Sequence, residues 1–203
     1  MAQLTNQCVS SAARFRYFSR MMLSKYAYIF AFLISAATAT AANHTFSKEY
    51  ETASITLPLR GTASYQYIFW KLYDAALYMP KDVAGEDVLG SGTPRALKLV
   101  YQREITAEQL VKSGTNILKK NYTAKQIADI QSGLDQINRC YQNVNEGDSY
   151  ELVYVPGAGT SLILNGSTQC TIPGEDFAKI YFSIWLGPNA KSRQLNNALC
   201  DLE

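Results

Sequence analysis

A long aromatic stretch between Leu57 and Pro80 dominates the hydrophobic pattern of this chain. Six of the fourteen residues from Tyr65 to Tyr78 are Tyr, Phe or Trp, a composition typical of strands. Apolar residues fall on both faces of this run. The pattern therefore predicts a central strand, or a bent pair of strands, covered on each side.

Shorter apolar segments bounded by turn residues predict the other strands. Asn165-Gly166 is the strongest turn signal among them, because this pair favours the tight turns of hairpins. The segments after Gly147 indicate a three-stranded meander. The expected strands are Ser54–Leu57, Ala96–Tyr101, Tyr150–Val155, Ser161–Leu164 and Thr168–Ile172. Pro58 is expected to terminate the first of them.

Helices are predicted in two regions of the chain. Thr106 and Thr123 each stand three residues before a glutamine, as in a capping box, and each is followed by apolar residues at steps of three and four. A further helix with a broad apolar stripe begins near Pro173 and stops at Gly187, and Lys191–Cys200 forms a short terminal helix. This order of elements predicts an α+β fold in which helices cover one face of a large antiparallel sheet.

The first 41 residues have the pattern of a secretory signal peptide. The charge-free run Tyr26–Ala37 follows a basic start and precedes a small-residue cleavage site ending at Ala41. Residues 1–20 suggest a start codon assigned too far upstream. An uncleaved membrane anchor is the alternative, but the run is short for a span of about 20 residues. We predict that residues 1–41 are a signal peptide, that residues 42–203 form one domain, and that the location is periplasmic or secreted.

Cleavage at this site changes the charge balance of the chain. The leader holds four of the 19 basic residues and none of the 17 acidic ones, so the formal net charge falls from +2 to −2. This balance does not suggest a nucleic-acid partner. The remaining domain of about 160 residues is large enough for a good core. We expect it to be a monomer with no stable membrane span after cleavage.

Three cysteines remain after the leader is removed, namely Cys140, Cys170 and Cys200. An oxidising compartment allows one disulfide and one spare thiol, and the sequence leaves all three pairings open. The spacing of about thirty residues, without any CxxC pair, argues against a zinc site. We expect one structural disulfide and no bound metal.

Sequence patterns for common catalytic chemistry are missing from the chain. The single histidine, His44, lies just after the proposed cleavage site, where neither a Ser-His-Asp nor a Cys-His mechanism can rely on it. Gly157-Ala158-Gly159 leads into a strand rather than a helix and is a hairpin turn, not a dinucleotide site. We therefore expect no cofactor. The aromatic residues either fill an ordinary core or line a cleft for an apolar or flat ligand between sheet and helices.

Several patterns occur in the order found in the exported bacterial branch of the chalcone isomerase-like family. The chain resembles that family in Gly61-x-Ala63 before the aromatic strand, in Tyr73–Tyr78, and in the Asn165-Gly166 turn. It also resembles it in Gly147-Asp148 and in the segment from Glu175 to Gly187. The resemblance runs from about Leu57 to Leu199. It implies the family's open-faced β-sandwich, with a ligand cleft between the sheet and the helical layer.

The resemblance does not carry over the residues of the plant enzymes that cyclise chalcones. The position of their oxyanion-binding arginine corresponds to Tyr65, and that of their threonine on the next strand to Tyr73. Their helix with tyrosine, lysine and asparagine corresponds to Thr106–Ser113, and their late threonine–methionine pair to Ile184-Trp185. Without the arginine, the main stabilisation of the oxyanion is lost. We therefore expect no chalcone isomerase activity.

Fatty-acid binding by some plant relatives makes an acyl ligand the first expectation. The resemblance implies a non-catalytic exported protein with Tyr65, Tyr73, Gln109 and Ser113 near the ligand and with Arg60 holding its carboxylate. One alternative is an isomerase or intramolecular lyase with another substrate, using tyrosine hydroxyls as acid and oxyanion donors. Another is an envelope structural or assembly factor, for which a sealed cleft filled by Tyr and Trp would be the sign.

Overall fold

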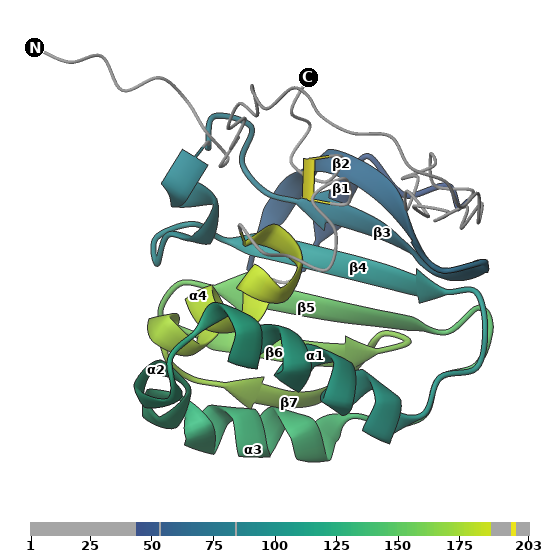
Figure 1. The fold of residues 1–203 in the computed structure, drawn as a ribbon. Coiled ribbons are helices and arrows are strands. Elements are labelled where there is room, and N and C mark those ends of the chain that lie inside the picture. Colours follow the sequence, from purple (N-terminus) through teal and green to yellow (C-terminus); the bar gives the residue numbers. More distant parts are fainter. Residues whose placement is uncertain (1–43, 53, 84, 188–195, 198–203) are drawn as a thin grey trace, which may run out of the picture.

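Seven antiparallel strands form one sheet in the described part of the protein, and their order in space follows their order in the chain (Figure 1). The computed structural model describes residues 44–52, 54–83, 85–187 and 196–197. The predicted signal peptide and nearly all of the predicted helix at 191–200 lie outside these residues. The strands are β1 (Glu49–Glu51), β2 (Thr56–Tyr67), β3 (Trp70–Tyr78), β4 (Arg95–Tyr101), β5 (Ser149–Val155), β6 (Gly159–Leu164) and β7 (Ser167–Ile172).

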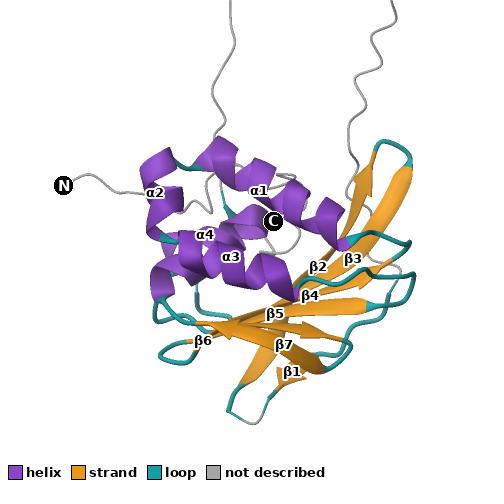
Figure 2. Cartoon of the chain, turned by 90° about the horizontal axis from the view of Figure 1, so that it is seen from below, coloured by secondary structure: helices purple, strands orange, loops and turns teal. Residues whose placement is uncertain are grey.

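The helices lie together on one face of this sheet (Figure 2). Three of them connect β4 to β5, and the fourth follows β7. The sheet and its helical layer confirm the α+β fold with an antiparallel sheet covered on one face. The helices are α1 (Ala107–Asn121), α2 (Ala124–Asp129), α3 (Gln131–Cys140) and α4 (Glu175–Leu186), and a 3-10 turn, η1 (Gly85–Leu89), precedes β4.

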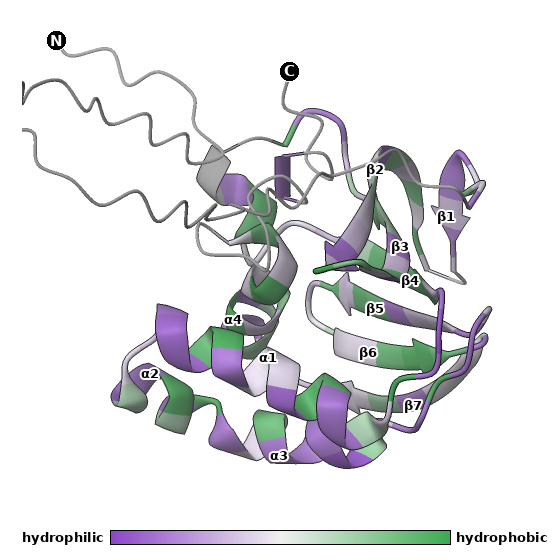
Figure 3. Cartoon of the chain, turned by 45° about the vertical axis from the view of Figure 1, so that its right-hand side comes forward, coloured by the Kyte–Doolittle hydropathy of each residue, from purple (hydrophilic) through white to green (hydrophobic). Residues whose placement is uncertain are grey.

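The main core fills the space between the sheet and the helices. α1 and α3 alternate between hydrophobic and hydrophilic bands (Figure 3), as expected of helices that bury one side. Nine of the twelve residues of α4 are buried, so this helix lies inside the layer. Burying each large apolar side chain contributes about 1.5–3 kcal/mol. The core includes Ala63, Ala75, Leu77, Leu97, Leu99, Leu152, Leu162, Ile172, Leu118, Leu134, Ile137, Phe177 and Ile184.

The opposite face of the sheet carries a smaller apolar cluster and a polar network. Leu57, Tyr78 and Val153 are buried there, with the N-terminal residues Phe46 and Tyr50 packed against the cluster. The Tyr50 hydroxyl donates a 2.7 Å hydrogen bond to Glu151, which also pairs with Lys98 at 2.8 Å. The opposite face is therefore partly covered by the chain's own N-terminal segment.

Both capping boxes predicted from the sequence are present, but the second predicted helix is two helices. Thr106 and Thr123 each accept a hydrogen bond from the backbone nitrogen three residues on, and the glutamine there bonds back. Ile130 lies between α2 and α3, and its φ of −112° and ψ of 11° are not helical. The side chain of Ile130 stays in the core across this break. An apolar periodicity that continues through a break cannot reveal it.

Of the two interpretations of the aromatic stretch, one central strand or a bent pair of strands, the structure shows the second, as a hairpin. β2 and β3 pair up to Tyr67 opposite Trp70, so Ile68 and Phe69 form a two-residue turn. The interpretation of the whole run as a strand covered on both sides was wrong at this end, where the side chains are exposed. The turn was hard to foresee because neither residue is a glycine or asparagine. The first predicted strand was also too short, since β2 continues through Pro58 to Tyr67.

A close approach between α3 and the sheet yields the first prediction, for Gly133. A Cβ at this position would lie 2.7 Å from the Phe177 ring and 2.9 Å from a methyl carbon of Ile172. We expect Gly133→Ala to destabilise the fold by roughly 1 kcal/mol, because overpacking costs about 1–3 kcal/mol and the better helix propensity of alanine returns about 1. Thermal denaturation measures the change. Gly92→Ala is the matched control, since nothing lies within 4 Å of its added Cβ; a Gly133→Ala protein as stable as the control would contradict the prediction.

Candidate functional site

Six aromatic side chains form a closed chain of contacts between the sheet and α4. We call them the aromatic cluster: Tyr73, Tyr101, Tyr150, Tyr141, Tyr181 and Trp185. Successive ring centroids are 6.0 Å apart for Tyr73–Tyr101, 6.2 Å for Tyr101–Tyr150, 5.1 Å for Tyr150–Tyr141 and 6.2 Å for Tyr181–Trp185. The Tyr141 and Tyr181 hydroxyls are hydrogen-bonded at 2.8 Å, and the Trp185 indole lies near the Tyr73 hydroxyl, which closes the ring.

The strand register explains how three tyrosines of this cluster meet. Tyr73 and Tyr101 are direct partners across β3 and β4. Tyr150 pairs with Leu99, so it is diagonal to Tyr101 on the same face of the sheet. Tyr65 extends the row by one strand, because it pairs with Tyr73 and stacks on it at 5.2 Å. The tyrosines therefore cross four neighbouring strands on the helix-facing side.

Burial keeps the hydroxyls of the cluster in their neutral form. Desolvation raises the pKa of Tyr73, and it raises the pKa of Tyr101 and Tyr181 well above the ordinary value. The pKa of Tyr65 is raised as well, again mainly by burial. A neutral hydroxyl donates a hydrogen bond to an oxygen atom but cannot remove a proton from a substrate at ordinary pH.

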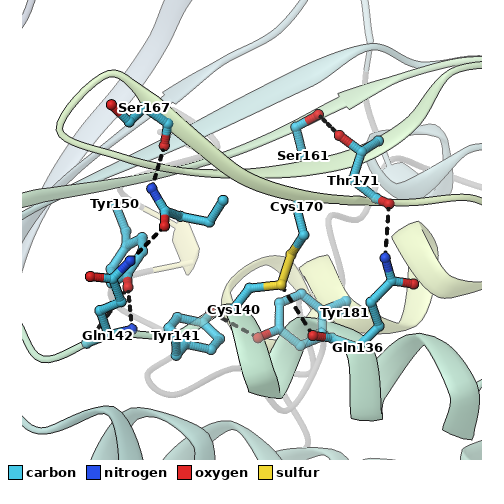
Figure 4. The surroundings of a disulfide bond; sticks show 11 residues. Gln136, Cys140, Tyr141, Gln142, Tyr150, Ser161, Ser167, Cys170, Thr171 and Tyr181 are labelled. Atoms are coloured by element: carbon cyan, nitrogen blue, oxygen red, sulfur yellow. Dashed lines mark hydrogen bonds between the residues drawn. A yellow bond between two sulfur atoms is a disulfide. The ribbon is translucent and has the colours of Figure 1, made fainter.

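A disulfide fixes one side of the aromatic cluster. Cys140, the last residue of α3, is bonded to Cys170 of β7. Figure 4 shows Tyr141 beside this bond, with its hydroxyl toward Tyr181, and Tyr150 accepting a hydrogen bond of 2.7 Å from the backbone nitrogen of Gln142. The structure thus contains one of the three pairings that the sequence left open. Cys200 lies outside the described residues.

At the start of β4, a buried arginine occupies the same face of the sheet. Arg95 is 0% exposed, and its guanidinium lies 4.6 Å from the Tyr154 ring centroid and 4.7 Å from that of Phe182. One terminal nitrogen, Nη1, donates to the carbonyl oxygens of Val88, Gly90 and Thr93 at 3.4, 3.0 and 3.0 Å. Nε and Nη2 have no hydrogen-bond partner among the described residues.

The charge on Arg95 is not balanced by a carboxylate in the described part of the chain, where the salt bridges involve only Lys71, Lys98 and Lys125 as cations. Burial lowers the pKa of Arg95 to about 10, which still leaves it protonated at neutral pH. Buried charges without a partner are costly, and a group with two unused donors is an evident binding point for an anion.

An apolar floor joins Arg95 to the aromatic cluster. Tyr101 lies six positions after Arg95 along β4, which corresponds to about 20 Å in a strand. Leu97 and Leu99 lie between them on the same face, flanked by Ala75 and Leu77 of β3 and Leu152 of β5. The face therefore offers a cation at one end, tyrosine hydroxyls at the other and only apolar side chains between.

The sequence contained a signal for Arg95 that its interpretation missed. Arg95 has the same parity along β4 as Leu97, Leu99 and Tyr101, whereas Lys98 falls on the other face. Because strand side chains alternate, an arginine in step with the leucines points into the core. The strand predicted at Ala96–Tyr101 begins one residue too late to include Arg95.

The residues predicted to bind ligand lie in three different surroundings. Tyr65 and Tyr73 are in contact, as described above. Arg60 lies in a β-bulge of β2 and donates from Nη1 to the carbonyl of Lys81, beyond the end of β3. That end is about 16 Å along the strand from Tyr73. Arg60 therefore does not share a place with the tyrosine pair.

The two residues predicted on the first helix also differ from one another. Gln109 is exposed, and its side-chain oxygen accepts the backbone N–H of Thr106 in the capping box at 3.0 Å. This bond gives Gln109 a structural task at the start of α1. Ser113 is half-buried one turn further along. Of the five predicted residues, the structure brings only Tyr65 and Tyr73 together.

Two surface grooves occur away from the aromatic cluster. One, of about 650 Å³, lies on the opposite face of the sheet between His44–Glu51, Tyr78 and Lys98. The other, of about 400 Å³, lies where the β5–β6 turn meets the start of α4, and Tyr154 forms part of its wall. No group of three or more potential metal ligands occurs among the described residues. Within the same residues, none of the helices is both long and apolar enough to cross a membrane.

Comparisons with known proteins agree with this architecture. A sequence model described as chalcone isomerase-like matches residues 38–200. Among the solved structures that match is a fatty-acid binding protein of Arabidopsis thaliana, with a TM-score of 0.63, 10% sequence identity, and coverage of 81% of this chain and 96% of that one. At this identity the likeness concerns the fold alone. A search of curated proteins found no match.

Proposed function

Because the chain belongs to the chalcone isomerase-like family, we propose that it is an exported, non-catalytic member that binds a fatty acid or a similar apolar anion between its sheet and its helices. The observation that carries this proposal is Arg95, a fully buried guanidinium at the end of an apolar row of side chains, two of whose donor atoms have no partner among the described residues. An acyl chain with a carboxylate matches that arrangement in both charge and polarity. The Arabidopsis protein with a similar fold is named a fatty-acid binding protein, which agrees with the choice of ligand.

The tyrosines do not suit the role of a catalytic base. The family position of the oxyanion-binding arginine corresponds to Tyr65, and the pKa of this tyrosine is raised by burial. The pKa of Tyr73 is raised as well. An isomerase that used either residue as a base would need the opposite shift, toward the tyrosinate, whereas one that used the hydroxyls as acid or oxyanion donors would need the neutral form that burial favours here. A neutral hydroxyl suits a hydrogen bond to a polar group of a bound ligand.

Ligand entry requires side chains to move, because the aromatic cluster closes the layer in this structure. Tyr73, Tyr101, Tyr150, Tyr181 and Trp185 are each no more than 6% exposed. This filling is also what we expect of a structural or assembly factor of the cell envelope, and it supports that function as the second candidate. The two candidates differ in whether a small molecule is bound.

Mass spectrometry of molecules extracted from the protein, purified from a host that exports it, tests the proposal. We expect a stoichiometric fatty acid, or tight binding of added palmitate that changes the tryptophan fluorescence. A protein that carries no ligand and binds no added fatty acid would reject the proposal in favour of the assembly role. Intact mass in the same sample tests export, because cleavage after Ala41 leaves a chain that begins at residue 42.

A further inference from the structure

The tip of the β2–β3 hairpin is the most apolar exposed feature of the described chain. Tyr67, Ile68, Phe69 and Trp70 are 60%, 60%, 90% and 61% exposed, and they are consecutive. We call these four residues the aromatic tip. The pairing of β3 with β4 starts only at Tyr73, so the hairpin projects beyond its neighbour in the sheet (Figure 2). Scattered exposed apolar residues need no explanation, but a contiguous set on a projecting turn does.

The backbone of the aromatic tip is strained at an apolar residue, Ile68. Ile68 has a φ of 57°, in the left-handed region that β-branched residues avoid, at the turn position where glycine is usual. Glycine would adopt this conformation without strain. Strain of this kind is typically found where a side chain has a function that outweighs its effect on stability. The isoleucine is therefore present in the turn despite the backbone strain that it causes.

Positive charge accompanies the aromatic tip. The Arg103 guanidinium lies over the Trp70 ring at 4.7 Å from its centroid. Lys71 follows the tip directly but is paired with Asp74 at 2.8 Å, and Glu104 follows Arg103 on the exposed surface. Arg103 is thus the cation in direct contact with the aromatic tip. Tryptophan and tyrosine beside arginine is the composition found where proteins meet the polar surface of a bilayer.

The size and shape of the tip decide between a protein and a lipid partner. A side of a stable protein interface buries about 800 Å², whereas these four side chains can offer roughly 500 Å². They also stand on a convex turn of two residues, which gives a partner protein no flat surface to pack on. A bilayer needs no matching surface, because the tip can insert among the headgroups.

We propose that the aromatic tip docks the protein on a lipid bilayer, with Phe69 and Ile68 reaching the acyl region, Trp70 and Tyr67 at the headgroup level and Arg103 against lipid phosphates. This membrane-docking site is separate from the ligand-binding site proposed above and does not depend on it. Tyr65 lies two residues before the tip and stacks on Tyr73 of the aromatic cluster, so the strand that carries the tip also reaches the interior.

Flotation with lipid vesicles tests the docking of the exported protein. We expect binding to vesicles of phosphatidylcholine mixed with phosphatidylglycerol, and weaker binding to phosphatidylcholine alone. Phe69→Asp should lower the partition more than tenfold, since it replaces the ring that inserts into the bilayer by a charge. Ala158→Asp is the matched control, because it places the same charge at another exposed hairpin tip and should bind like wild type.

Two further variants separate docking from folding. The chain has two tryptophans, so in a Trp185→Phe background the emission reports Trp70 alone and should shift to shorter wavelength with vesicles. Ile68→Gly should fold at least as stably as wild type and yet bind vesicles less. The proposal is overturned if wild type does not float with either vesicle, if Phe69→Asp floats equally well, or if the Trp70 emission does not shift. A dimer in solution that Phe69→Asp dissociates, without vesicle binding, would assign the tip to self-association instead.

Discussion

Replacing Arg95 by Leu is expected to lower the affinity for a fatty acid by about a hundredfold or more while leaving the affinity for its methyl ester nearly unchanged. A carboxylate that uses Nε and Nη2 gains two charge-assisted hydrogen bonds, each contributing about 1.5–3 kcal/mol. The ester cannot accept them with a full charge. Calorimetric titration of acid and ester against the wild-type and variant proteins measures both differences.

The Arg95→Leu protein is expected to lose some stability as well as ligand affinity. Arg95 also holds the carbonyls of Val88, Gly90 and Thr93, so its removal loosens the segment before β4 even though it removes a buried charge. The wild-type comparison needs no variant: equal affinities for acid and ester would show that no cation holds the carboxylate. That outcome rejects the role of Arg95 but leaves apolar binding between sheet and helices intact.

Arg60 provides the competing hypothesis within the same experiment. The sequence predicted that Arg60 holds the carboxylate, and the structure places its guanidinium against Lys81 at the far end of β3. If Arg60 has this role, Arg60→Ala should lower the affinity for the acid but not for the ester. Arg95→Leu should then change the two affinities equally. We expect the reverse, because Arg95 is fully buried on the helix-facing side of the sheet, whereas Arg60 is partly exposed and bonds the carbonyl of Lys81.

The fold could be predicted from the sequence largely because its strands and helices are bounded by local signals. The capping threonines at 106 and 123 and the turn at Asn165-Gly166 determine element ends through backbone hydrogen bonds and φ values that only a few residue types support. The β2–β3 turn lacked such a signal, since Ile68 occupies a glycine conformation. A hairpin turn that has no glycine or asparagine cannot be recognised from the sequence, and this turn is part of the aromatic tip.

The candidate site was harder to predict because it depends on which face each side chain occupies. Tyr65 and Tyr73 meet through the strand register, which follows once β2 and β3 are recognised as a hairpin. Gln109 was predicted near the ligand but is used by the helix cap, where it bonds Thr106. Arg95 was missed although its alternation with Leu97 was visible. Burial of an arginine contradicts its usual preference for the surface, so composition alone directs attention elsewhere.

Removing the disulfide between Cys140 and Cys170 is expected to lower the free energy of unfolding by about 3–4 kcal/mol. The bond closes a loop with a sequence separation of 30, and in the chain-entropy account a loop of that length restricts the unfolded state by this amount. It also attaches α3 to β7 beside the Tyr141–Tyr181 hydrogen bond, so its loss loosens the support of the aromatic cluster. At about 2–4 °C per kcal/mol, the melting temperature should fall by roughly 10 °C.

Denaturant unfolding of matched proteins measures this effect. All variants carry Cys200→Ser, so that Cys140 and Cys170 are the two cysteines from residue 42 onward. The Cys140→Ser, Cys170→Ser protein should lose the stated stability, and reducing the parent with dithiothreitol should reproduce most of that loss. A parent whose stability is unchanged on reduction would contradict the prediction. If fatty-acid affinity falls along with stability, the disulfide also holds the ligand-binding layer in place; if affinity is unchanged, its effect is confined to the unfolded state and to the anchoring of α3.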